Sequence, residues 1–91
     1  MQIELSTYQA SQTMYATYDA ANDNYRLASR AAKLPVAEMY LRMAKELTAV
    51  MITLVNLLSE DKYYNDPLQQ QRRRAEDHVM RLKESEIEAH Q

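Results

Sequence analysis

Hydrophobic side chains recur every three or four residues along most of the chain, and Pro35 and Pro67 interrupt this pattern at two points. This spacing is typical of helices that bury one face. The chain also has no glycine and is rich in residues that favour helix. The pattern therefore predicts one all-α domain with three long helices, an up-down-up bundle or extended helical hairpin completed by self-association or by a partner. The expected bounds are 1–91 for the domain and about 3–33, 36–62 and 67–86 for the helices.

The two prolines define the predicted helix boundaries. In "NDPLQ", Asp66 can cap a helix that starts at Pro67, and Gln69 can bond back to the cap. The stretch "AAKLPVAE" offers no polar cap, and the apolar pattern continues through it, so a kinked helix is an alternative. An interior proline costs about 3 kcal/mol and disfavours helix in the residue before it. We therefore favour a chain reversal near Leu34 over a kink at Pro35.

The second helix is apolar over more than half of its circumference. A sector about 120° wide predicts its core face, which comprises Val36, Met39, Tyr40, Met43, Leu47, Val50, Met51, Leu54, Leu57 and Leu58. The third helix offers only a thin apolar stripe, so it cannot cover this surface alone. We expect the surplus to bind another protein or a second copy, because folded chains rarely leave large apolar patches in water. Met39, Met43 and Met51 are candidate contacts, since methionine adapts to varied partners.

Four tyrosines follow one side of the first predicted helix. Tyr8, Tyr15, Tyr18 and Tyr25 lie within about 100°, beside a strip of alanines and Met14. One interpretation packs the strip against the second helix and leaves the rings to cover the seam with their hydroxyls in water. A second makes the four tyrosines partner-binding residues, because tyrosine is enriched in interfaces. A platform for stacked bases is a third, but residues 1–25 contain no lysine or arginine.

The charge pattern bears on nucleic-acid binding. The net charge is -2, so general attraction to polyanions is excluded. The only concentrated charge is "QQQRRR", in which Arg72, Arg73 and Arg74 point in three directions about 100° apart on a helix. One interpretation is a solvated helix with ion pairs from Arg72 to Glu76, Arg73 to Asp77 and Asp77 to Arg81. The alternative is a nucleic-acid-associated regulator that acts through this cluster and Arg81.

The sequence shows no pattern of catalysis or of metal binding. It has no cysteine, no glycine-rich phosphate loop and two histidines outside any recognisable ligand spacing. We expect no enzymatic activity, no cofactor, no metal and no small-molecule substrate. The N-terminus lacks a secretory signal pattern, and the apolar run at 49–58 is about half the length of a membrane span. We expect a cytoplasmic protein without a membrane segment.

Taken as a whole, the pattern favours a non-enzymatic protein-interaction module such as a small adaptor, chaperone or inhibitor. Its predicted partner-binding surface combines the apolar face of the second helix with the tyrosine side of the first. Arg72 and Arg73 are further candidate contacts. Cations in the first turns of a helix oppose its dipole, so we expect these arginines to face either Glu60, Asp61 and Asp66 of the same chain or an acidic patch on a protein partner.

Overall fold

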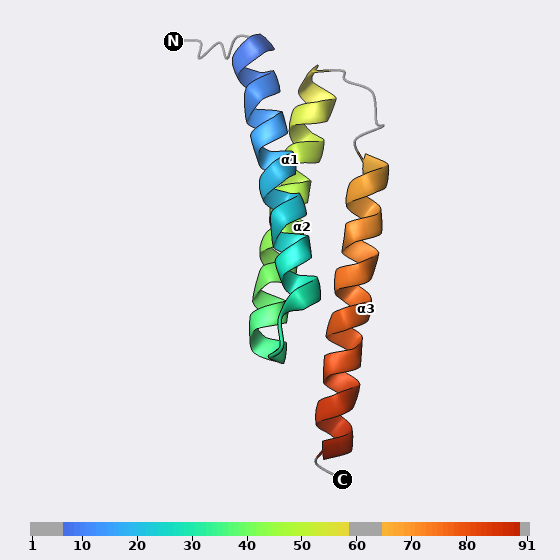
Figure 1. The fold of residues 1–91 in the computed structure, drawn as a ribbon. Helices are drawn as coiled ribbons and strands as arrows, with labels where there is room; N and C mark the ends of the chain where they lie inside the picture. The colour runs from blue at the N-terminus through green and yellow to red at the C-terminus, as the bar shows by residue number, and fades with distance from the viewer. Residues whose placement is uncertain (1–6, 59–64, 90–91) are drawn as a thin grey trace.

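The computed structural model describes residues 7–58 and 65–89, which form three helices, α1 (Thr7–Arg30), α2 (Leu34–Leu58) and α3 (Asn65–Ala89) (Figure 1). These residues contain no strand, so the predicted all-α class is confirmed. The helix starts at 34 and 65 each lie two residues before the predicted ones, and α1 ends three residues earlier than expected. The predicted helical positions 3–6 and 59–62 lie outside the described residues.

Residues 31–33 reverse the chain, as favoured above, so α1 and α2 are separate helices. The backbone N–H of Ala37 donates to the carbonyl oxygen of Lys33 at 3.0 Å, which is the first bond of the α2 ladder. Pro35 therefore lies in the first turn, where N–H groups have no intrahelical acceptor and its missing hydrogen loses no bond. In α3 the helix starts at Asn65 and Pro67 again falls in the first turn. The side chain of Asp66, the predicted cap, lies outside the described part.

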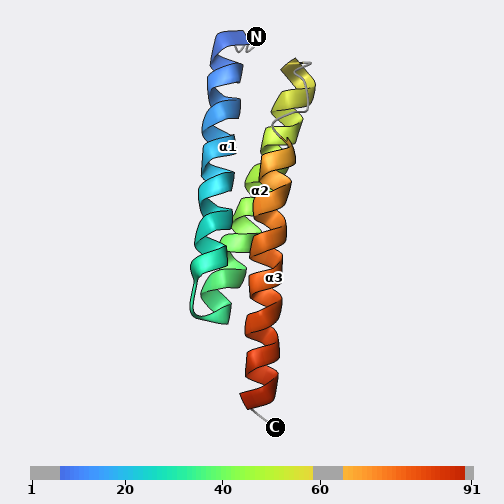
Figure 2. The ribbon, with the colours of Figure 1, turned by 45° about the vertical axis from the view of Figure 1, so that its right-hand side comes forward.

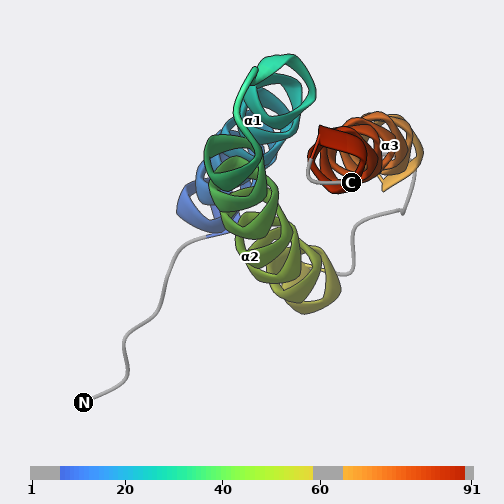
Figure 3. The ribbon, with the colours of Figure 1, turned by 90° about the horizontal axis from the view of Figure 1, so that it is seen from below.

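The three helices have an up-down-up arrangement. α1 and α2 form an antiparallel hairpin, and α3 runs in the direction of α1 and extends past the reversal (Figures 1 and 2). Viewed from below, α1 and α2 run side by side and α3 lies to one side of the pair (Figure 3). Contact is most extensive between α1 and α2 and least extensive between α2 and α3. α2 therefore packs mainly against α1, and it contacts α3 least.

Small side chains spaced seven residues apart line the contact between α1 and α2. Ala21 and Ala28 of α1 and Ala37 and Ala44 of α2 have no exposed surface, and Met14 and Met51 are buried toward the open end of the hairpin. Alanine lets helix backbones approach closely, and the two methionines fill the wider space at the open end. α3 completes the core with Leu68, Ala75 and Val79.

The predicted core face of α2 is wrong in its orientation. Val36, Met39, Met43 and Val50, expected inside, are between 38% and 49% exposed. At about 100° per residue, the buried positions centre roughly a quarter-turn around the helix from the predicted face. The reason is steric, because large side chains between the helices would prevent the close contact that the alanines allow.

Some residues of the predicted face do contribute to the core. Met51 is buried, and Tyr40, Leu47 and Leu54 are half-buried and pack against the core cluster. The side chains of the remaining two predicted core residues, Leu57 and Leu58, lie outside the description. Because α2 is oriented differently from the prediction, some of the predicted core residues lie at the edge of the core and others lie on the surface.

Candidate functional site

Four large apolar side chains lie exposed on one side of α2, and we call them the outer stripe. They are Val36 (38% exposed), Met39 (41%), Met43 (42%) and Val50 (49%). At about 100° per residue they fall within roughly 60° of one another. Lys45, whose Nζ lies 3.6 Å from a carboxylate oxygen of Glu76 on α3, projects from nearly the opposite side of α2. The outer stripe therefore faces away from α3.

Half-buried residues join the outer stripe to the core. Tyr40, Leu47 and Leu54 lie between the two, and with three of the stripe residues they follow alternating steps of four and three along the helix. This set comprises 36, 40, 43, 47, 50 and 54. Such alternation is the spacing of a coiled-coil seam, on which a second helix can lie.

A shallow hollow of about 410 Å³ opens beside the N-terminal end of the outer stripe. Leu34, Pro35, Glu38, Met39 and Arg42 line it. Its walls are partly apolar, and the first turn of α2 forms one end. The hollow can receive a side chain from a helix that lies along α2. The surface therefore offers a depression for a ligand side chain as well as apolar contacts.

The structure separates the predicted methionine contacts. Met39 and Met43 lie in the outer stripe, whereas Met51 is only 2% exposed and belongs to the core of its own chain. Met51 is therefore not on a surface that a partner reaches in this fold. The difference arises because Met51 projects toward α1, about a quarter-turn or more around α2 from the other two.

The tyrosines of α1 are also divided between surface and core. Tyr8 is 70% exposed and Tyr15 46%, Tyr18 is half-buried against the core cluster, and Tyr25 is only 1% exposed. Tyr25 is thus a core residue, and the suggestion that its hydroxyl lies in water is wrong. Tyr8 and Tyr15 lie about 120° to 140° around α1 from Ala21, which packs against α2. They point away from α2 and do not form one surface with the outer stripe.

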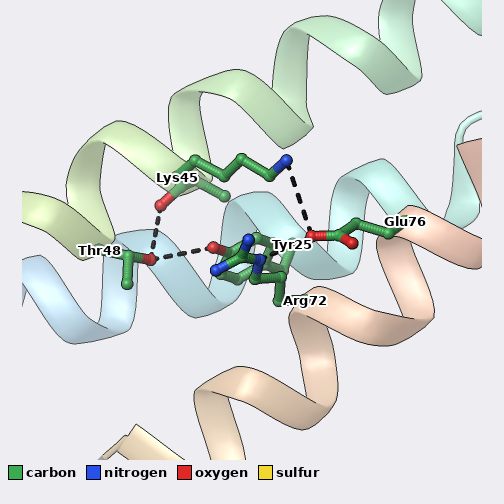
Figure 4. Close-up of polar contacts among 6 residues, drawn as sticks. Tyr25, Lys45, Thr48, Arg72 and Glu76 are labelled. Carbon is green, nitrogen blue, oxygen red and sulfur yellow. Dashed lines mark hydrogen bonds and ion pairs between the residues drawn. The ribbon is translucent and has the colours of Figure 1, made fainter.

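The Tyr25 hydroxyl lies in a buried polar pair with Thr48, 3.1 Å from its Oγ1 (Figure 4). The Thr48 hydroxyl donates its single hydrogen to the carbonyl oxygen of Ala44 at 2.7 Å, so Tyr25 donates to Thr48. Sequence reasoning missed Thr48, which is 5% exposed, because one threonine in an apolar run carries no distinct signal. This pair fixes the register of α1 against α2.

A charged cluster joins α3 to α2. Arg72 Nε lies 2.6 Å from Oε1 of Glu76, and Lys45 reaches the same oxygen (Figure 4). The hydrogen bond from Arg72 holds the pKa of the Glu76 carboxyl below its usual value, and the same bond raises the pKa of Arg72. Arg72 is therefore committed to a contact within the chain.

The other residues of the basic segment have different surroundings. Arg73 and Arg74 are exposed. Asp77 does not form the predicted ion pairs with Arg73 and Arg81, and among the described side chains of α3 the carboxylate that pairs with arginine is Glu76. His78 Nε2 lies 2.6 Å from the carbonyl oxygen of Ala31. Since a carbonyl can only accept, Nε2 donates and connects α3 to the turn between α1 and α2.

The described residues include no cluster of His, Cys, Asp or Glu that could bind a metal ion. Within its described residues, none of α1, α2 and α3 is both long and apolar enough to cross a lipid bilayer. No protein-family profile, curated protein or solved structure matches the chain.

Proposed function

We propose that this protein is a non-enzymatic protein-interaction module that binds an apolar helix along the outer stripe of α2. The observation that supports this function is the exposure of four large apolar side chains on one side of a single helix. Folded chains rarely leave such contiguous apolar surface in water unless it binds something.

The chemistry of the outer stripe suits a helical ligand. An amphipathic helix docks through residues spaced three and four apart, which is the spacing that α2 itself presents. Met39 and Met43 have unbranched side chains that can adapt to a partner's surface. Whether the module acts as an adaptor, a chaperone or an inhibitor depends on what the partner does.

Nucleic-acid binding through the basic segment has weaker support. Arg72 is paired with Glu76. The exposed Arg73 and Arg74 are followed within three residues of sequence by the acidic residues Glu76 and Asp77. Phosphate contacts would make affinity fall steeply as salt is raised, whereas an apolar helical contact changes little. The salt dependence of binding therefore distinguishes the two functions.

Affinity capture from a lysate of the source organism, followed by mass spectrometry, tests the proposed function with a matched pair of variants. Met43→Glu places a charge in the outer stripe, and Met80→Glu makes the same change at a 59% exposed position on α3. We expect wild type and Met80→Glu to retain the same protein, with or without nuclease and at raised salt. Met43→Glu should lose it while keeping its helical circular dichroism. Equal retention by both variants would contradict the proposal.

A further inference from the structure

We infer that the outer stripe binds a second copy of this chain, with the two α2 helices antiparallel and related by a two-fold axis at the level of Ala44. This inference rests on the proposed function and names its partner. The seam spacing of α2 extends to both sides of this level, from Val36 to Val50 and Leu54. A two-fold axis at this level places the N-terminal half of one outer stripe against the C-terminal half of the outer stripe in the second copy.

Two unpaired charges support this arrangement. Arg42 and Glu46 are exposed beside the outer stripe, on its side away from α1. Among the side chains that the structure describes, the ion pairs are those of Glu76 with Lys45 and Arg72, so neither Arg42 nor Glu46 has an ionic partner among them. In the antiparallel pair, Arg42 and Glu46 lie two residues before and two residues after the level of the axis, and both are on the same flank of α2. Arg42 of each copy therefore meets Glu46 of the other, giving two symmetric ion pairs.

The apolar residues fit the same register. Met43 lies next to the two-fold axis and can contact Met43 of the second copy. Val50 of one chain lies at the level of Glu38 and Met39 of the other, where the shallow hollow beside the stripe is centred. The surface is thus complementary to itself in both shape and charge.

A parallel pair fits less well. In parallel coiled coils one flank of a helix faces the opposite flank of its partner. The flank with Arg42 and Glu46 would then meet the side of α2 that carries Ala37 and Ala44, which α1 already covers. The antiparallel arrangement leaves both copies of α1 in place.

Charge exchange tests the inference on the full chain by sedimentation equilibrium. Arg42→Glu alone and Glu46→Arg alone each bring like charges together twice, so each should raise the dimer dissociation constant about tenfold or more. The double exchange, Arg42→Glu with Glu46→Arg, restores both pairs and should return the constant close to that of wild type. A mixture of the two single variants should form a heterodimer. Both positions are exposed, so circular dichroism should show unchanged helix content.

Disulfide trapping tests the direction of the helices, because the chain has no cysteine of its own. Met39→Cys mixed with Val50→Cys should form a linked dimer under oxidation. Met39→Cys alone should not, because the two copies of this residue lie about 15 Å apart along an antiparallel pair. Efficient linkage of Met39→Cys to itself would indicate a parallel pair and overturn the inference.

Two further outcomes would also overturn it. A dimer that is indifferent to both single charge reversals would use another interface. A wild-type chain that sediments as a monomer at high micromolar concentration would exclude the second copy as the partner. In that case a protein captured by wild type and lost by Met43→Glu would still support the interaction module with a different chain as its ligand.

Discussion

The buried hydrogen bond between Tyr25 and Thr48 leads to a prediction about the order of three variants. Tyr25 donates to Thr48 Oγ1, and Thr48 donates in turn to the Ala44 carbonyl oxygen. Tyr25→Phe removes a donor and leaves Thr48 with its bond to Ala44 intact. The loss should be that of one ordinary hydrogen bond, about 0.5 to 1.5 kcal/mol of unfolding free energy.

Thr48→Val keeps the shape of the side chain but leaves the Tyr25 hydroxyl without an acceptor. Tyr25 is only 1% exposed, so water cannot replace the lost partner. An unsatisfied buried hydroxyl costs about 1 to 3 kcal/mol, so this variant should be the less stable of the two. In the double variant neither group is left unsatisfied, and its loss should fall below the sum of the single losses by about 1 kcal/mol or more.

The assay is urea or thermal unfolding followed by circular dichroism at one protein concentration. A loss of 1 kcal/mol lowers Tm by about 4 to 8 °C in a domain of this size. Thr53→Val is the matched control, because the Thr53 hydroxyl donates to the Ala49 carbonyl in the same way but is exposed and has no tyrosine partner among the described residues. It should cost little. Additive losses in the double variant would refute the hydrogen bond between the two side chains.

Three other predictions follow from the core and from the charged cluster. Ala21→Leu should destabilise the fold by about 1 to 3 kcal/mol by separating the helices, whereas the exposed Ala16→Leu should be nearly neutral in the same melts. Leu68→Ala should lower the free energy of unfolding by about 2 to 5 kcal/mol, more than Leu47→Ala does at a half-buried position. The reverse order in urea unfolding would support the core face of α2 that the sequence predicts. The fold lowers the pKa of Glu76, so this residue stabilises the folded state at pH values above its unfolded pKa of about 4.3. This stabilisation is lost as pH falls through the pKa of Glu76 in the folded state. Glu76→Gln should flatten that part of the curve of stability against pH, and an unchanged curve would show that the ion pair contributes nothing.

The helices could be predicted from the sequence because their causes are local. Periodicity, the absence of glycine and the two prolines each act within a few residues. The reversal before Pro35 followed from the same reasoning, since an interior proline disfavours helix in the residue before it.

The orientation of α2 could not be predicted from hydrophobicity alone. Apolar residues cover more than half of this helix, so several faces are compatible with a core, and hydrophobicity favours the bulkiest of them. The informative signal was the seven-residue spacing of small residues, Ala21 with Ala28 on α1 and Ala37 with Ala44 on α2. Close packing of helices depends on which side chains are small enough to let the backbones meet, and a hydrophobicity count does not measure that.

The candidate site was predicted in part. Met39 and Met43 were identified as contacts and do lie on the surface, but they were expected on the same face as the core. Tyr25 and Met51 were grouped with surface candidates because side-chain type does not reveal which of several similar residues is covered. Arg42 and Glu46 were missed, since their significance depends on which side of α2 is left open.

The short turn at residues 31–33 has a consequence for the order of folding. It joins the ends of the two helices that share the most extensive contact. Closing so short a loop costs little chain entropy, so pairing of α1 with α2 can start at the turn and spread along both helices. The core residues of α3, Leu68, Ala75 and Val79, lie far from this turn in sequence. During synthesis on the ribosome, α1 and α2 can therefore pair before the third helix has been made.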